Sequence, residues 1–446
     1  MIIIYLIIIV FFILYAIKDF SKSFILFAAV QTILNSGMAI RFQPPAITVN
    51  LVLVIFFAVM YYLKYRYKFL LSCEPFFKKA FLWMLISLIT SIGVALLNGD
   101  TSAFTMGIRI IFSQYIFVFV FWHVCNTRKD LIYFSKCILG VFTIVFAYGL
   151  FEYMTDSNPF LDMIRANIPD AYADDKLYIS DLEYKLRGGR ARLQSLFYIT
   201  ILYGINSILF VFYIITVFKK QKDFKIKKFY LWIMVLLGLF ACYLSNSKTP
   251  IVAIPLFAFP YFFKNKYSLL VWISLAVFIL DPEIFNQIIG QVIDLESLDI
   301  NNDDVSSGST FAMRLRQLDV SFNAFLKSPF FGNGLKYSGY LASTIAGADL
   351  LGAESCWFKL LIEQGLLGIS AYIYIMYTFI KEGAKISKND KCSLSFFALA
   401  FFVIVSITDI GYELFYILFI ALYKIYSFNN SNINYDKTVS YSNITK

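Results

Sequence analysis

The chain alternates long apolar runs with short polar stretches up to about residue 426. Most runs approach the roughly 20 residues that a helix needs to cross the hydrocarbon core of a bilayer. We predict transmembrane helices at 2–17, 24–40, 46–63, 80–97, 104–125, 131–152, 196–217, 229–244, 249–263, 268–280, 355–380, 392–408 and 412–426. The pattern predicts an all-α polytopic membrane protein with about 12–13 transmembrane helices.

Composition agrees with this fold class and excludes two others. Hydrophobic residues make up 59% of the 446 residues and charged residues 15%, and the mean hydropathy is +0.70. A typical soluble chain has about 25% charged residues, so a soluble fold of this size would leave too much apolar surface in water. The same composition excludes intrinsic disorder for most of the chain. We predict one integral membrane domain over 1–426 and a disordered cytoplasmic tail over 427–446.

The basic residues predict the topology. One alternating set of short loops holds 21 Lys and Arg residues, whereas the short loops of the opposite set hold two, Arg41 and Lys248. Because cytoplasmic loops are enriched in Lys and Arg, the first set is predicted to be cytoplasmic and the N-terminus outside. Two long segments, about 153–195 and 281–354, then lie on the outer face. The net charge of +10 follows from the basic loops and does not require nucleic acid.

The sequence does not contain the residues that several classes of reaction require. His123 is the single histidine, and no two of the six cysteines form a CxxC pair, so neither a histidine-based triad nor a zinc site is indicated. P-loop, GxSxG and dinucleotide-binding motifs do not occur. Acidic pairs in the long loops could bind a divalent cation, but such pairs are common in polar loops. We therefore predict no metal and no cofactor.

Arginines gather in the two outer segments. The first ends in "KLRGGRARLQSLF", with Arg187, Arg190 and Arg192, and the second holds "FAMRLRQLDVSFNAFLKSPFFGNG", with Arg314 and Arg316. The planar guanidinium binds phosphate through two parallel hydrogen bonds and stays charged at neutral pH. These clusters are candidates for binding an anionic lipid-linked group. The alternative is contact with lipid head groups or a solvated surface.

Four further residues are candidates for the same region. Lys248 lies on the short outer turn "LSNSKTP", and Arg109 lies about one turn inside a helix from its outer end, within reach of a cavity. Glu354 precedes the eleventh helix, where a carboxylate is either a helix cap or a general base for a substrate hydroxyl. Glu363 lies nine residues further on, in an apolar stretch where ionisable groups are often functional. Its alternative role is packing against Lys359, four residues earlier.

The ordered set of motifs resembles the O-antigen polymerase and O-antigen ligase family of bacterial polysaccharide assembly. "RLQSLF" is similar to the arginine stretch of that family and places Arg192 at its arginine. "LSNSKT" resembles the Ser-rich outer turn, with Lys248 where the family has Arg. "RLRQLDVSFNAFLKSPFFGNG" resembles the segment that carries the next arginine, here Arg314, before a Gly-x-Gly. "ESCWFKLLIEQGLLG" resembles the following helix, where ligases carry a His-Asn pair and this chain has Glu354 and Ser355.

The resemblance implies a metal-independent, inverting glycosyltransferase with an architecture like that of the GT-C enzymes. The growing glycan would leave undecaprenyl pyrophosphate and pass to a sugar hydroxyl of the next lipid-linked repeat unit, at the outer face of the bacterial inner membrane. Arg192 and Arg314 would stabilise the leaving pyrophosphate, and Glu354 would be the general base. Arg187, Arg190, Lys248, Arg316 and Arg109 would bind substrate. Partners would be the lipid-linked oligosaccharide, membrane lipid and a chain-length regulator, and no nucleic acid.

Two other functions fit the same helices. A ligase would attach the finished glycan to a lipid core, but the missing histidine argues against it. A flippase for lipid-linked oligosaccharides would also need outer cations. Transporters usually contain internal repeats and a site at the bilayer midplane, and neither is evident in this sequence. The resemblance therefore favours a polymerase.

Overall fold

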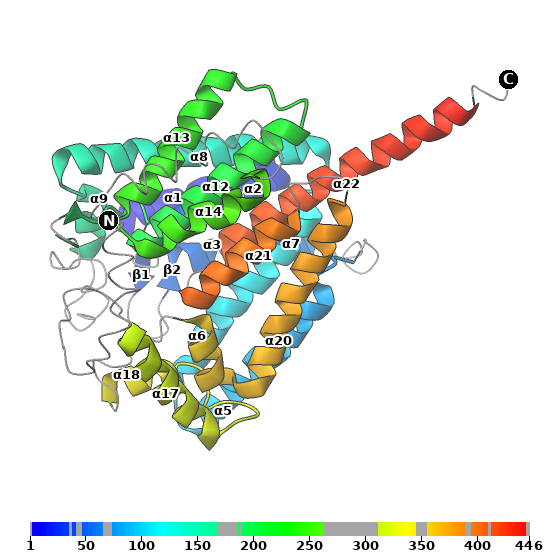
Figure 1. Ribbon diagram of the computed structural model, residues 1–446. Coiled ribbons are helices and arrows are strands. Elements are labelled where there is room, and N and C mark those ends of the chain that lie inside the picture. The colour runs from blue at the N-terminus through cyan, green and yellow to red at the C-terminus, as the bar shows by residue number, and fades with distance from the viewer. Residues whose placement is uncertain are drawn as a thin grey trace.

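The computed structural model of the protein is mostly helical (Figure 1). It describes residues 2–34, 38–41, 47–65, 74–166, 186–187, 190–197, 199–262, 311–344, 355–388, 394–408 and 412–442. The predicted span 268–280 and Glu354 lie outside these residues.

The helices of the first half are α1 (Ile2–Lys18), α2 (Phe20–Val30), α3 (Val49–Tyr65), α5 (Lys78–Leu97), α6 (Ser102–Ile110), α7 (Phe117–Val124), α8 (Arg128–Thr155) and α9 (Pro159–Arg165). A 3-10 helix, η1 (Gln31–Ile33), follows α2, and a π-helix, η2 (Ile111–Ile116), joins α6 to α7. Two short antiparallel hairpins pair β1 (Ala39–Arg41) with β2 (Ile47–Thr48), and β3 (Leu186–Arg187) with β4 (Arg190–Ala191).

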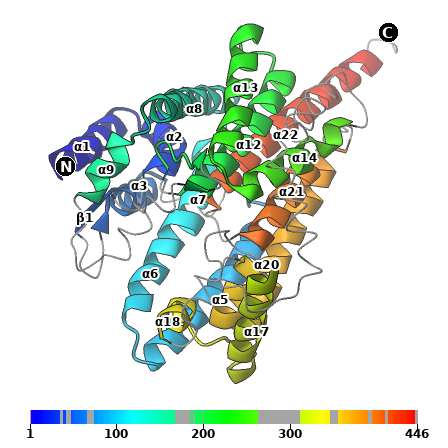
Figure 2. The same ribbon diagram turned by 60° about the vertical axis from the view of Figure 1, so that its left-hand side comes forward.

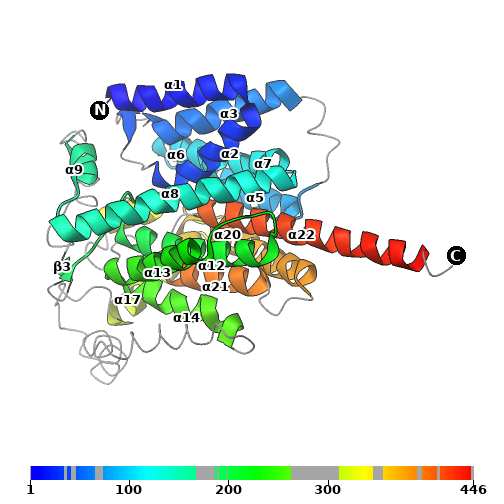
Figure 3. The ribbon, with the colours of Figure 1, turned by 90° about the horizontal axis from the view of Figure 1, so that it is seen from above.

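The helices of the second half are α12 (Thr200–Lys220), α13 (Lys228–Leu244), α14 (Lys248–Phe262), α17 (Phe311–Lys327), α18 (Tyr337–Thr344), α20 (Cys356–Ile386), α21 (Leu394–Ile407) and α22 (Glu413–Ser442). In the view from above, α1 and α3 lie along one edge and α14 along the other, with α8 and α12 between them (Figure 3).

The helices confirm a polytopic membrane protein. Within the described residues, five helical stretches are long and apolar enough to cross a membrane: α5, the continuous stretch Ser102–Val124, α8, α12 and α20. Shorter apolar helices accompany them, among them α3, α13 and α21. Eleven of the predicted spans coincide with helices of the structure to within a few residues at most ends, which supports the register of the apolar pattern.

Contacts at one end of the helices join the predicted basic loops. Arg128 Nε lies 3.5 Å from Asp223 Oδ2, and Asn429 Nδ2 donates to Lys220 O at 2.9 Å. Lys424 Nζ donates to the carbonyl oxygens of Trp122 and Cys125, at the end of α7. We call this side of the molecule the basic face. The opposite helix ends, which carry residues 97–102, 190–200, 244–248 and 328–344, form what we call the loop face.

Aromatic side chains fill the space between the helices. Phe401 stacks on Phe415 with 3.9 Å between ring centroids, and Phe212 stacks on Phe397 at 4.5 Å. These pairs join α21 to α22 and α12 to α21. Because lipid tails are as apolar as leucine, helices in a membrane associate through such close packing rather than through the hydrophobic effect. The 49 Phe residues of the sequence serve this packing in part.

Two helical regions differ from the predicted ones. The predicted helix 24–40 is α2 followed by η1 and β1, because Asp19 caps a helix that begins at Phe20 and the turn-forming sequence Asn35-Ser36-Gly37 follows. The last helix, α22, continues to Ser442, whereas the sequence predicts a disordered tail from residue 427. Apolar residues nevertheless become sparse after Phe428.

The helix predicted at 355–380 folds back on itself. Gly365 has φ 59° and ψ −151°, and it divides α20 into segments 356–364 and 366–386. The ring of Trp357 in the first segment packs against that of Tyr372 in the second, with centroids 5.1 Å apart. The two segments are therefore antiparallel neighbours, and Gly365 is the apex between them.

The apex is held by the turn 329–334. Leu366 N donates to Pro329 O at 2.8 Å, and Asn333 N donates to Ile362 O at 2.9 Å. A Cβ on Gly365 would lie 2.6 Å from Pro329 O, and a Cβ on Gly332 would collide with the backbone of Glu363 and Gln364. The Gly-x-Gly of the second outer segment thus serves close backbone packing. Together with α5, α17 and α18, the apex forms the end of the molecule opposite the C-terminus (Figure 2).

Candidate functional site

Arg192 and the Ser-rich turn lie together on the loop face. Arg192 Nη2 donates to Thr200 Oγ1 at 2.9 Å and to Ser247 Oγ at 3.2 Å, and the two hydroxyl oxygens are 3.2 Å apart. Leu193 N also donates to Leu244 O at 3.1 Å. Two motifs about 50 residues apart in the sequence therefore meet, as the resemblance implied. We call Arg192, Thr200 and Ser247 the Arg192 cluster.

Two helices begin at this cluster. α12 starts at Thr200, and its N-cap residue, Ile199, provides no side-chain hydrogen bond to the first turn. α14 starts at Lys248, the residue after Ser247. The first N–H groups of a helix point out of its N-terminus and carry a partial positive charge, which favours a bound anion. A guanidinium beside two such helix starts is suited to a phosphate group.

Glu152 holds the loop that carries Arg192. This carboxylate, near the end of α8, is 4% exposed, and its Oε2 accepts from Ser195 N at 2.6 Å and from Gln194 N at 3.3 Å. Ser195 has φ 52°, and its carbonyl accepts from Asn158 Nδ2 at 2.9 Å. A buried carboxylate that accepts from two backbone N–H groups fixes the turn next to Arg192. Glu152 was not among the residues predicted from the sequence. The one feature that could have indicated it is its position as an acidic residue at the end of an apolar helix.

The other predicted cations of these loops lie in two places. Arg187 and Arg190 are a Cα pair across the β3–β4 hairpin, which precedes Arg192 directly. Arg314 and Arg316 lie in the first turns of α17, whose other end packs on α20 through Ala324. The structure therefore places Arg187 and Arg190 in the chain segment leading to the Arg192 cluster, and Arg314 and Arg316 on a helix of the α20 end.

Ser355, and not Glu354, is the N-cap of α20. Its Oγ accepts from Trp357 N at 3.3 Å and donates to Ser406 O at 2.7 Å. The cap interaction that offered an alternative role for Glu354 is thus made by its neighbour. Because α20 folds back at Gly365, Ser355 lies against the end of α21 rather than at the apex.

Arg109 lies on α6, two residues before the π-helix η2. It lies within electrostatic reach of Glu413, the first residue of α22, whose Oε1 accepts from Gln114 Nε2 at 3.3 Å. π-Helical turns inside α-helices are frequent at functional sites. Arg109 is itself exposed, so it lies at the surface of α6 within electrostatic reach of the first residue of α22.

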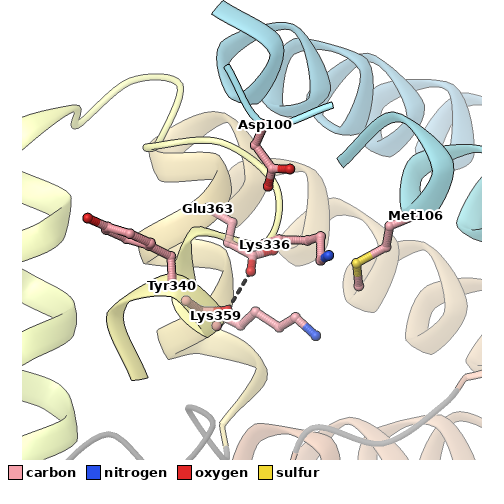
Figure 4. A pocket seen from close by; sticks show the side chains of 8 residues that line it. Asp100, Met106, Lys336, Tyr340, Lys359 and Glu363 are labelled. Carbon is pink, nitrogen blue, oxygen red and sulfur yellow. Dashed lines mark hydrogen bonds between the residues drawn. The ribbon is translucent and has the colours of Figure 1, made fainter. Parts of the chain in front are cut away.

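A cavity of about 420 Å³ is lined by residues of α6, α18 and α20, of the turn between α5 and α6, and of the turn before α18 (Figure 4). Two lysines and two acids line it: Lys336, Lys359, Asp100 and Glu363. Glu363 is 1% exposed, and its Oε1 accepts from Ser338 Oγ at 2.5 Å. Asp100 Oδ1 accepts from Ser102 Oγ at 2.6 Å, and this hydrogen bond lowers the pKa of Asp100 against the opposing effect of partial burial. The sequence pointed to Glu363 and Lys359 but not to Asp100 or Lys336.

His123 lies at the end of the stretch Ser102–Val124 that is opposite the loop face. It is at the cytoplasmic end predicted for α7, on the basic face, where its Nδ1 is 2.9 Å from Phe119 O and its ring packs near Tyr61. No group of three or more His, Cys, Asp and Glu side chains gathers in the described part of the chain. The acidic pairs considered for a divalent cation fall in 167–185 and 281–310, outside that part.

Comparison with known proteins finds one family match, which lies in the second half of the chain. Residues 233–373 match the family model Wzy_C, described as O-Antigen ligase. No curated protein and no solved structure matches the chain. The match spans α13 to the first part of α20 and confirms the resemblance based on the motifs. These residues are thus similar to a family of glycan-transferring membrane enzymes of surface polysaccharide synthesis.

Proposed function

We propose that the protein is a surface polysaccharide polymerase of the O-antigen type. It transfers the growing glycan from undecaprenyl pyrophosphate to a sugar hydroxyl of the next lipid-linked repeat unit. It works as an inverting glycosyltransferase that needs no metal. The site is on the loop face, which faces the periplasm or outer side of a bacterial inner membrane.

The observation that carries this proposal is the Arg192 cluster. In the reaction, the acceptor oxygen forms a bond to the anomeric carbon of the donor glycan as the bond from that carbon to the pyrophosphate oxygen breaks. Negative charge then grows on the pyrophosphate. Arg192 Nη2, which lies within 3.2 Å of Ser247 Oγ, and the starts of α12 and α14 are positioned to stabilise this charge. A metal ion is not needed where fixed cations do this.

The other residues have supporting roles. Arg314 is the second cation for the pyrophosphate, and Glu354 takes the proton of the acceptor hydroxyl as it attacks. Arg187, Arg190, Lys248, Arg316 and Arg109 bind substrate.

A polymerase is favoured over a ligase by the place of the single histidine. The ligases of the family carry a histidine where this chain has Glu354, and His123 lies on the basic face, at the opposite ends of the helices from the Arg192 cluster. The expected partners are lipid-linked oligosaccharide repeat units, membrane lipid and a chain-length regulator.

Reconstitution with lipid-linked repeat units tests the proposal. Purified protein in proteoliposomes is expected to give a ladder of glycans on undecaprenyl pyrophosphate, measured by gel electrophoresis of labelled repeats. A single transfer to a lipid core would indicate a ligase. Protection of the repeats inside the vesicles without bond formation would indicate a flippase. Either result would exclude polymerisation as the activity.

Reporter fusions test the predicted orientation. A fusion after Lys228, on the basic face, is expected to report the cytoplasm, because 21 basic residues lie in the loops of that set. A fusion at Asn246, in the Ser-rich turn, should report the outer side. The opposite pair of results would place the Arg192 cluster in the cytoplasm and contradict the proposed site of synthesis.

A further inference from the structure

The cavity beside Glu363 differs from the Arg192 cluster in the charges it presents. Two ammonium groups, from Lys336 and Lys359, face two carboxylates, from Asp100 and Glu363, so the formal charges of these four groups cancel. Figure 4 shows the side chains of both lysines extending toward Met106 of α6. A polyanion such as pyrophosphate would meet two like charges here. A ligand with many hydroxyl groups could donate to the carboxylates and accept from the ammonium groups.

The polar groups are held in place by the fold. Ser338 Oγ donates to Glu363 Oε1 at 2.5 Å, and Lys336 Nζ donates to Ser102 Oγ at 2.8 Å. The volume of about 420 Å³ lies within the range of roughly 300–1,000 Å³ that is usual for small-molecule sites. Fixed hydrogen-bonding groups around a space of this size are what a sugar ring requires, because its hydroxyl groups point in defined directions.

Two residues that line the cavity, Lys359 and Met106, lie on helices that also carry residues of the proposed function. Lys359 is four residues, about one helical turn, from Ser355 along the first segment of α20. Met106 is three residues from Arg109 on α6. A glycan in the cavity would therefore lie along the first segment of α20, between the apex at Gly365 and Ser355.

We propose that this cavity binds the sugar portion of the acceptor, the lipid-linked repeat unit, while the Arg192 cluster binds the pyrophosphate of the donor. Lys336 and Lys359 donate to ring and hydroxyl oxygens of the acceptor glycan, and Asp100 and Glu363 accept from its hydroxyl groups. This assignment rests on the proposed function, since it divides the two substrates of a polymerase between two sites.

The test measures binding of two probes to full-length protein in lipid nanodiscs. One probe is the repeat-unit oligosaccharide released by mild acid from the surface polysaccharide of the producing strain. The other is undecaprenyl pyrophosphate without sugar. Lys359→Met keeps the apolar stem of the lysine, and Glu363→Gln keeps an acceptor oxygen for Ser338, so both variants should fold. Lys385→Met, at the exposed basic end of the same helix, is the matched control.

We expect Lys359→Met and Glu363→Gln to weaken oligosaccharide binding at least tenfold and to leave undecaprenyl pyrophosphate binding within twofold of wild type. Arg192→Ala should weaken undecaprenyl pyrophosphate binding and leave oligosaccharide binding near wild type. Lys385→Met should change the binding of neither probe. The proposal is overturned if wild-type protein does not bind the oligosaccharide at millimolar concentration, or if the two cavity variants bind it normally. It is also overturned if these variants lose undecaprenyl pyrophosphate instead.

The outcome is separable from that of the proposed function. If the cavity variants lose the oligosaccharide but wild-type protein forms no glycosidic bond in reconstitution, the cavity is a glycan site of a protein that is not a polymerase. If ladders form although the cavity variants bind the oligosaccharide normally, the polymerase remains and the acceptor binds elsewhere.

Discussion

The Arg192 cluster and the cavity beside Glu363 lie on the same face of the molecule, but they are built differently. The cluster joins one arginine to two hydroxyl groups at the starts of two helices, so its charges are positive. The cavity balances two lysines with two acids around an open space. The first arrangement suits a compact anion, and the second suits an uncharged ligand with many hydroxyl groups. The comparison teaches that the groups placed around a cation, as well as the cation itself, define which ligand chemistry a region can accept.

The largest effect is expected from the arginines. Arg192→Ala should lower polymer formation about a hundredfold or more, because losing a charge-assisted contact in a dry site costs roughly 2–4 kcal/mol of transition-state stabilisation. Arg314→Ala should have a similar effect, and Arg192→Lys should recover part of the activity, since the fork geometry is lost. Ladders from proteoliposomes with equal amounts of protein measure this.

Arg165→Ala is the control for these variants. Arg165 belongs to α9 on the same face and pairs with Asp162 at 2.9 Å, three residues away. It should retain wild-type activity. Normal ladders from Arg192→Ala would remove the cluster from the mechanism.

Glu354→Gln is expected to lower polymerisation on the order of a hundredfold or more while the thermal stability stays near wild type. Gln retains an acceptor oxygen for backbone N–H groups but is not basic enough to take the proton of a hydroxyl group. Ser355→Ala provides the contrast. It removes the N-cap and should cost about 1 kcal/mol of stability. If Glu354→Gln forms normal ladders, the general base is a different residue.

Gly365→Ala should damage the cavity and spare the Arg192 cluster. Its φ of 59° and ψ of −151° fall in a region that is essentially reserved for glycine, and a side chain there costs about 1–3 kcal/mol before any collision with Pro329 O. We expect a lower thermal stability and at least tenfold weaker oligosaccharide binding. Gly140→Ala, in the middle of α8 with no atom within 4 Å of the added Cβ, should have neither effect. Equal loss of both probes in Gly365→Ala would show that the two regions are not independent.

The smallest effect is expected from Glu152→Gln. The amide keeps one acceptor oxygen but directs an NH₂ group at the backbone N–H groups of Gln194 and Ser195, so Arg192 should be less well positioned. We expect kcat per folded molecule to fall about tenfold while KM for the acceptor stays constant. A purely structural role would instead reduce the amount of folded protein and leave kcat unchanged.

The sequence by itself determined the fold class, the register of most spans and the set of loops that share a face. Apolar runs and basic loops can both be read from short stretches of sequence. A span needs about 20 apolar residues, and the number of Lys and Arg residues in each short loop indicates its side of the membrane. The motifs also placed Arg192 and the Ser-rich turn in one functional group, and the structure brings them within hydrogen-bonding distance.

The tertiary structure alone decided how α20 and the cavity are arranged. The apolar pattern of 355–380 continues through Gly365, so it predicted one straight helix, and the fold-back comes from the backbone of 329–334 packing against the apex. Asp100, Lys336 and Glu363 are far apart in the sequence, and the tertiary structure brings them together around one cavity. Glu152 was missed for a similar reason: its partners are backbone N–H groups, which every residue except proline has and which no sequence pattern distinguishes.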